Sequence, residues 1–218
     1  MGDRLGLIGY HYSVYTRIVR MAGIAFELQL RYTEADPFAA HPDPVLAAHT
    51  PLGRVPVLTH GDFILTETAA ILRYLSALAA GPSLVPNDPK AAARMAQVIG
   101  IVDAYGYVPM VRQVFSNAVF APMMNEAGDP EQIVRGLAGA KPALSLLNEI
   151  ATEGLVLNGT VTLADIHLAP MISYFTMAKD GAALLAQYAA LAMWWARAST
   201  LPCLQNTDPF APQAHLPV

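Results

Sequence analysis

Val55-Pro56-Val57-Leu58-Thr59 and Phe63-Ile64-Leu65 flank His60-Gly61-Asp62, and this stretch decides the fold. Short apolar runs on either side of a tight turn that contains glycine predict a β-hairpin. From about Glu67 to Leu78 the apolar side chains recur at helical spacing. The stretch is therefore predicted to form two antiparallel strands followed by a helix.

The residues before the hairpin predict a strand, a helix and a second strand. Leu5–Tyr10 is an apolar run of strand length, and the helical spacing of Tyr15–Ala22 stops at a glycine. Phe26–Leu30 alternates apolar and polar residues, as a half-buried strand does. A proline-rich loop with at most a short helix, Val45–Ala48, leads to the hairpin. The order β-α-β, loop, β-β-α is that of a thioredoxin-like α/β domain.

Beyond this domain the sequence predicts helices only. A linker rich in turn-forming residues, 81–89, separates residues 1–80 from residues 90–218. The helical patterns after the linker are Ala91–Phe120, Glu131–Glu153, Leu163–Ala178 and Tyr188–Ser199. Thr162 and Asp165 form a variant of the capping box that opens a helix. The second domain is therefore predicted to be all-α.

The composition supports a sizeable core and argues against a membrane span. Hydrophobic residues make up 54% of the 218 residues and charged residues only 14%. No uncharged apolar run reaches the roughly 18 residues that a spanning helix needs. The longest candidate, Val161–Ala178, contains Asp165 and His167 and is predicted to be a buried helix. The N-terminus shows no leader pattern, so a cytoplasmic location is expected.

Charge and ligand spacing argue against two further kinds of partner. The net charge is −4 and no cluster of Lys and Arg occurs, so nucleic acid is not an expected partner. No set of His, Cys, Asp and Glu has the spacing of metal ligands, so no metal is expected. Cys203 is the only cysteine and cannot form an intramolecular disulfide.

Four segments carry a resemblance to a known family. They are Ser13–Arg20, Pro51–Leu58, Leu65–Leu75 and Val161–Pro170. With these segments in this order, the chain resembles the cytosolic glutathione transferases, in particular the serine-type phi and theta classes. The resemblance covers nearly the whole chain. It implies the glutathione transferase fold, an α/β thioredoxin-like N-terminal domain followed by an all-helical domain.

The resemblance implies a site for glutathione, which carries two carboxylates, one ammonium and a thiol. Val55 would offer its backbone N–H and C=O to the cysteinyl part of glutathione beside a cis Pro56, as an added strand does. Thr68 would bind the γ-glutamyl carboxylate and Glu67 would face the ammonium at a helix N-terminus, which favours an anion. Ordinary helix capping is the alternative role for these two residues.

The remaining carboxylate, on the glycine of glutathione, needs a cation or a donor. His41 falls where the phi class places a glutathione-binding histidine, with Pro42 in place of the lysine that often follows. A solvated loop histidine is the alternative.

Ser13 is the residue that the resemblance assigns to the thiol. A free thiol has a pKa of about 8.5, and lowering it by about two units requires about 2.7 kcal/mol of preference for the anion. One hydrogen bond to a charged group supplies about 1.5–3 kcal/mol, so one hydroxyl near a helix N-terminus is about sufficient. Tyr12 is the next candidate, with Tyr10 and Tyr15 nearby, and simple capping by Ser13 is the alternative.

The resemblance predicts an enzyme that conjugates glutathione to small hydrophobic electrophiles, as in detoxification, and a homodimer. A wall for the second substrate is predicted from residues that also fit plain core packing: Tyr12, Tyr107, Met110, Val111 and Phe115. Isomerisation, dehalogenation, ether cleavage and peroxide reduction with glutathione are alternative reactions of the same fold. The alternative to an enzyme is a non-enzymatic interaction module with the same fold.

Overall fold

Four strands form one mixed sheet in the computed structural model, which describes residues 4–81 and 83–211. The strands are β1 (Leu5–Gly9), β2 (Arg31–Glu34), β3 (Val57–His60) and β4 (Phe63–Leu65), in the order β2-β1-β3-β4. β1 and β2 are parallel, and β3 is antiparallel to both of its neighbours. The predicted hairpin is present, with Gly61 at φ 58° in its turn. The thioredoxin-like fold predicted for this part of the chain is confirmed.

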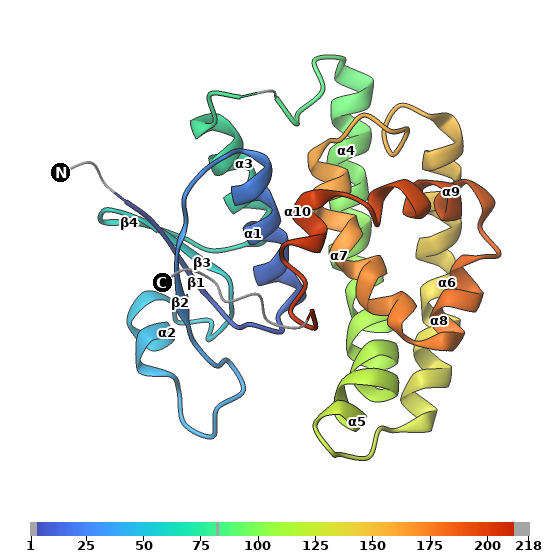
Figure 1. Cartoon of the computed structure of the whole chain (residues 1–218), viewed down its shortest axis with the longest axis horizontal. Coiled ribbons are helices and arrows are strands. Elements are labelled where there is room, and N and C mark those ends of the chain that lie inside the picture. The colour runs from blue at the N-terminus through green and yellow to red at the C-terminus, as the bar shows by residue number, and fades with distance from the viewer. Residues whose placement is uncertain (1–3, 82, 212–218) are drawn as a thin grey trace. The chain divides into compact units, whose positions relative to one another are not determined.

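Helices cover both faces of this sheet. Successive residues of a strand point to opposite faces. Ile8 and Val57 lie opposite each other and pack with Leu46 of α2 (Pro44–His49). Their neighbours Leu7 and Leu58 are equally buried on the other face, where Figure 1 shows α1 (Val14–Ala25) and α3 (Thr68–Leu78) side by side.

The strand predicted at Phe26–Leu30 is wrong, because these residues close the end of α1 instead. The backbone N–H of Phe26 donates to the carbonyl of Ala22, and that of Leu28 donates to the carbonyl of Gly23. Glu27 takes a positive φ of 55°, as residues just past a helix often do. The alternation of polar and apolar residues reflects side chains that pack against the helix end, and β2 begins only at Arg31.

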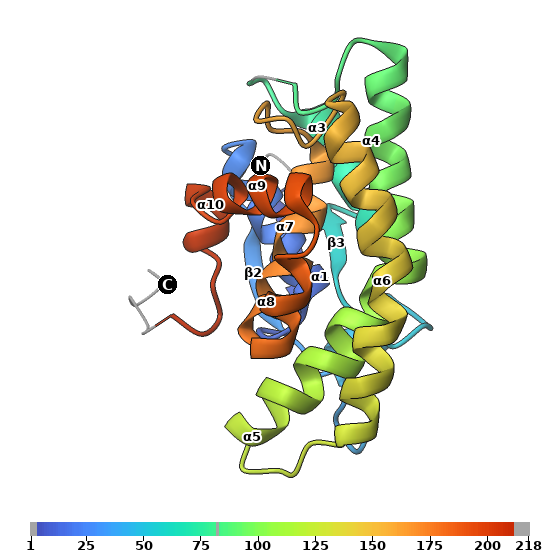
Figure 2. The same ribbon diagram turned by 90° about the vertical axis from the view of Figure 1, so that its right-hand side faces the viewer.

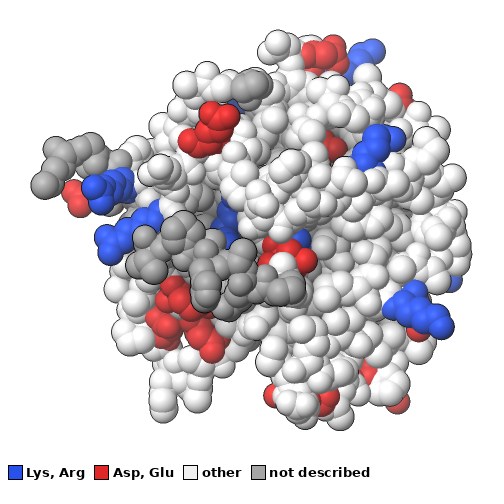
Figure 3. All heavy atoms as spheres, viewed as in Figure 1, with Lys and Arg blue, Asp and Glu red and all other residues white. Residues whose placement is uncertain are grey.

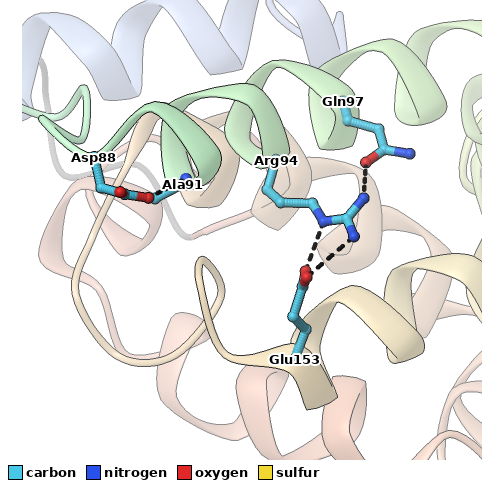
Figure 4. A network of polar contacts seen from close by, with 5 residues as sticks. All are labelled: Asp88, Ala91, Arg94, Gln97 and Glu153. Atoms are coloured by element: carbon cyan, nitrogen blue, oxygen red, sulfur yellow. Dashed lines mark hydrogen bonds and ion pairs between the residues drawn. The ribbon is translucent and has the colours of Figure 1, made fainter.

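The rest of the chain is helical. The elements are α4 (Pro89–Ile101), the π-helical η1 (Val102–Gly106) and η2 (Val108–Phe120), α5 (Ala121–Met123), α6 (Pro130–Glu153), α7 (Leu163–Met177), α8 (Lys179–Leu185), α9 (Ala189–Ala198) and α10 (Pro202–Gln205). Figure 2 shows α4 and α6 as long neighbouring helices. An Arg94–Glu153 ion pair at 2.6 Å joins them (Figure 4). The all-helical character predicted beyond the linker is confirmed up to residue 201, although α8 was not expected.

The contacts divide the chain into two units. One is the chain up to Pro82 together with the segment from Pro202, and the other is Ser83–Leu201. The sequence assigned the segment from Pro202 to the second domain, whereas its contacts are with the first unit. Residues 1–3, Pro82 of the predicted linker and residues 212–218 lie outside the described residues.

The helical unit is organised around α7, which is buried along most of its length. Its first turn carries the predicted capping box. The carboxylate of Asp165 accepts hydrogen bonds from the backbone N–H and the hydroxyl of Thr162, each at 2.8 Å. The indole of Trp194 on α9 donates to the same carboxylate, also at 2.8 Å. One turn further, the buried ring of His167 lies 2.7 Å from the carboxylate of Asp103. The capping box is therefore a buried, fully paired network within this unit.

Candidate functional site

The strand directions bring four connecting segments to one edge of the sheet. β1 and β2 are parallel, so both end at this edge. β3 is antiparallel to β1 and begins there, and β4 is antiparallel to β3 and ends there. The segments at this edge are therefore those that hold Ser13, His41, Val55-Pro56 and Glu67-Thr68. The topology places on one edge every residue that the sequence assigns to glutathione.

Ser13 caps the N-terminus of α1 just past the end of β1. Its Oγ accepts a hydrogen bond from the backbone N–H of Thr16 at 3.2 Å. A hydroxyl that accepts in this way still has its own proton to donate. The residue is half-buried, so a ligand at the sheet edge can reach the hydroxyl. Ser13 therefore fulfils the capping role and keeps a donor for a second partner.

The turn before Ser13 is tightly built. The side chain of Thr16 accepts from the backbone N–H of Tyr10 at 3.3 Å, and the N–H of Ser13 donates to the carbonyl of Tyr10 at 2.9 Å. A Cβ on Gly9 would lie 2.3 Å from the Thr16 side chain. The absence of a side chain at residue 9 allows the helix to begin this close to the strand.

The Val55–Pro56 peptide bond is cis, as the family resemblance implies. Pro56 is buried, and half-buried Val55 packs against the cluster that contains Ile8 and Val57. Ile8 pairs with Val57, so the same register continued by two residues points Val55 toward Tyr10. The Val55–Pro56 segment thus lies next to the Ser13 turn.

The N-terminus of α3 is open. Within the described residues, no side chain caps this helix, and Glu67 at the N-cap position has a φ of 66°. Thr68 is buried, with 7% of its surface exposed, whereas Glu67 is exposed. The first N–H groups of a helix and its positive dipole end form a site for a carboxylate. This arrangement suits the γ-glutamyl end of glutathione.

Two basic residues lie in the remaining segments of this edge. His41 is exposed, two residues before Asp43, the N-cap of α2. Backbone N–H groups, first that of Leu46 and then that of Asp36, lower the pKa of Asp43 and hold this loop. Arg54 is also exposed and directly precedes Val55. Arg54 was not predicted from the sequence, although its positive charge directly before Val55 is a signal that the sequence carries.

The tyrosines near Ser13 are held by other groups. The pKa of Tyr10 is raised by burial and then by Asp36, and its ring contacts that of Phe38 with centroids 5.7 Å apart. Tyr12 is half-buried, and its ring stacks on Phe210 with centroids 5.5 Å apart. Tyr32 donates to Glu34 at 2.5 Å, and burial and this bond raise its pKa.

The other residues predicted to line the site of the second substrate lie in the helical unit. They belong to η2 and to its junction with η1. Met110, Val111 and Phe115 are buried, and Tyr107 is half-buried. The ring of Phe115 stacks on that of Tyr174 with centroids 4.4 Å apart. These side chains therefore have core partners in their own unit, and their place in a substrate wall stays a prediction.

Figure 3 shows Lys and Arg scattered over a mostly uncharged face. None of the helices in residues 4–81 and 83–211 has the length and apolar character needed to cross a membrane. Among the same residues, no three His, Cys, Asp or Glu side chains are placed to hold a metal ion.

Comparison with known proteins identifies what the chain is similar to. Residues 7–83 match the family model "Glutathione S-transferase, N-terminal domain". Glutathione S-transferase F10 of Arabidopsis thaliana is 28% identical over 160 residues, 72% of this chain and 74% of the relative. Residues 7–83 of this chain are therefore similar to the N-terminal domain of the glutathione S-transferases.

Solved structures show the same fold. Glutathione S-transferase III in its apo form has a TM-score of 0.82 at 23% identity, with 98% of this chain and 100% of that chain covered. The theta class glutathione S-transferase of Xanthomonas axonopodis pv. citri, solved with glutathione bound, has a TM-score of 0.73 at 22% identity. That comparison covers 94% of this chain and 97% of the other.

Proposed function

We propose that this protein binds glutathione at the sheet edge and conjugates its thiolate to small hydrophobic electrophiles. The observation that carries the proposal is the convergence of three elements on one edge. They are the hydroxyl of Ser13, the cis Val55–Pro56 segment and the open N-terminus of α3. Similarity to the glutathione S-transferases supports it, and two solved structures of the same fold hold glutathione.

Each group of glutathione has a proposed partner. The backbone of Val55 pairs with the cysteinyl residue, and Thr68 with the first N–H groups of α3 binds the γ-glutamyl carboxylate. Glu67 faces the ammonium, and His41 or Arg54 neutralises the glycine carboxylate. Held at these points, the sulfur lies near the start of α1, where Ser13 donates to it.

The chemistry is a nucleophilic attack by sulfur. Donation by the Ser13 hydroxyl stabilises the thiolate over the thiol, so a larger fraction is ionised near neutral pH. The thiolate forms a carbon–sulfur bond with the electrophile, and the leaving group departs with the electron pair of the broken bond. Binding both reactants in one orientation supplies much of the rate. The proposed wall for the electrophile includes Tyr12, Tyr107, Met110, Val111 and Phe115.

The proposal extends to a cytoplasmic homodimer without a metal cofactor. The family resemblance supports a two-fold dimer and a cytosolic place. Light scattering of the purified protein tests the dimer, since a mass of one chain, 23.3 kDa, would contradict it.

Calorimetry with glutathione, paired with a rate assay on chlorodinitrobenzene, tests the function. We expect saturable heat at millimolar glutathione and a conjugation rate well above the uncatalysed one. Heat without conjugation would point to another glutathione reaction, and a panel of isomerisation, dehalogenation, ether-cleavage and peroxide substrates would then identify it. No heat at millimolar glutathione would refute the proposal and favour an interaction module.

A further inference from the structure

The C-terminal segment Pro202–Ala211 returns to the first unit and packs beside the start of α1. Figure 1 shows α10 next to α1, in agreement with the contacts between them. The guanidinium of Arg17 on α1 is buried and donates to the carbonyl of Leu204 at 3.0 Å. A cation at the C-terminal end of a helix is favourable, so this contact anchors the segment. Arg17 lies one helical turn after Ser13, whose carbonyl accepts its backbone N–H.

The end of the segment contacts the two residues that precede Ser13. The carbonyl of Pro209 accepts a hydrogen bond from Nε2 of His11 at 3.2 Å. The ring of Phe210 stacks on Tyr12 at an interplanar angle of 25°. Pro209 is buried in this contact although it lies 198 residues from His11 in the sequence.

These contacts complete the support of the Ser13 turn. Its backbone is held from β2, where Glu34 accepts the N–H of His11 at 2.9 Å, and from α1 through Thr16. The side chains of His11 and Tyr12 are held from the C-terminal segment. A hydrogen bond weakens steeply as its angle departs from linearity. The hydroxyl of Ser13 therefore depends on the whole turn for its direction.

We propose that Pro209 and Phe210 are positioning residues, which act through His11 and Tyr12 to aim the Ser13 hydroxyl at the glutathione sulfur. This inference rests on the proposed role of Ser13. The C-terminal segment would then contribute to activation of the thiol. Loss of the Phe210 ring is therefore predicted to lower turnover more than it weakens glutathione binding.

Three substitutions test this role. Phe210→Ala removes the stack, Phe210→Tyr keeps the ring, and Phe63→Ala is a control on an exposed phenylalanine of β4. For Phe210→Ala we expect the apparent pKa of the bound thiol to rise by about one unit. We expect kcat, measured at a pH below that pKa, to fall roughly tenfold, because the ionised fraction there falls about tenfold for each unit of rise. The glutathione dissociation constant should change less than about threefold. Phe210→Tyr should restore both properties, and Phe63→Ala should match the wild type.

Amide hydrogen exchange without glutathione tests the contact independently of catalysis. Exchange of the peptide that covers Tyr10–Arg17 should be several-fold faster in Phe210→Ala than in Phe63→Ala. His11→Phe, which keeps a ring and removes the donor to Pro209, should give a smaller change in the same direction.

The outcomes separate this inference from the proposed function. Unchanged exchange and an unchanged pH profile in Phe210→Ala would overturn the inference while the wild-type activity stands. A fall in kcat with an unchanged thiol pKa would also overturn it, because the ring would then serve packing or the second substrate. If exchange is faster in Phe210→Ala but the wild type binds no glutathione, the proposed function is refuted, and with it the role of the segment in thiol activation.

Discussion

The starts of α1 and α7 use the same capping chemistry with opposite results. At α7, the carboxylate of Asp165 is bonded to Thr162 and Trp194, and all three side chains are buried. At α1, Ser13 accepts one backbone N–H and remains half-buried with a proton to donate. A closed cap uses its hydrogen-bonding capacity within the protein and stabilises the fold. An open cap leaves part of that capacity for a ligand.

The start of α3 extends the comparison. It lacks a side-chain cap among the described residues, and its N-cap residue Glu67 has a left-handed φ of 66°. Backbone conformations of this kind cost about 1–3 kcal/mol and are concentrated at functional sites. The two open starts, those of α1 and α3, lie on the same edge of the sheet, whereas the closed start of α7 lies in the other unit.

Asp165→Ala should have the largest effect, and on stability. The change leaves the indole N–H of Trp194 and the N–H of Thr162 buried without their partner, so we expect a loss of about 3 kcal/mol in the free energy of unfolding. Urea denaturation measures it. Asp129→Ala removes the exposed cap of α6 and should cost only about 1 kcal/mol. Equal losses in the two variants would show that the closed network adds nothing to a simple cap.

Thr68→Val should have its effect on glutathione rather than on the fold. The change keeps the shape of the buried side chain and removes a hydroxyl that caps nothing in α3. We expect the glutathione dissociation constant from calorimetry to rise about tenfold, the equivalent of one hydrogen bond to a charged group. Thr33→Val on β2 serves as the control. An unchanged dissociation constant would remove Thr68 from the site.

Glu67→Gly should change stability and binding in opposite directions. Glycine tolerates a positive φ, so we expect a gain of about 0.5–1 kcal/mol in stability and a several-fold weaker binding of glutathione. Glu27→Gly, at φ 55°, is the matched control and should raise stability without an effect on glutathione. Thermal unfolding and calorimetry give the two quantities. Weaker binding in both variants would argue against a specific contact by Glu67.

Arg94→Ala should have the smallest effect, because its ion pair with Glu153 is more than a third exposed (Figure 4). The hydrogen bond from Arg94 lowers the pKa of Glu153. A carboxyl with a lowered pKa in the folded state adds stability above its unfolded pKa of about 4.3, and this contribution is lost as the pH falls. We expect a melting temperature within about 2 °C of the wild type at neutral pH. The difference should vanish in acid, and a difference that grows in acid would contradict this account.

The parts of the fold that follow from local chemistry could be predicted from the sequence. Asp165 three residues after Thr162 gives the buried cap, and the glycine-containing turn after Val57–His60 gives the hairpin. The cis bond before Pro56 followed from the family resemblance and is confirmed. The grouping of Ser13, Val55 and Thr68 followed from the family resemblance, and the directions of β1, β3 and β4 bring the three segments to one edge of the sheet.

The parts that depend on contacts distant in the sequence could not be predicted. Phe26–Leu30 alternates as a strand does, but the end of α1 takes up its backbone N–H groups. The described part of the C-terminal segment, Pro202–Ala211, has one four-residue helix, and no local pattern shows that it packs beside Arg17. Arg54 lies within the segment Pro51–Leu58, but only the strand directions show that this segment shares an edge with Ser13 and Thr68.

The pKa of the glutathione thiol, followed by its ultraviolet absorbance in the bound state, tests the central claim that Ser13 is an open cap. We predict a value roughly two units below the free thiol's pKa of about 8.5, and a return by at least about one unit in Ser13→Ala. Ser199→Ala, at the end of α9, should leave the value unchanged. An equal thiol pKa in the wild type and in Ser13→Ala would contradict the account.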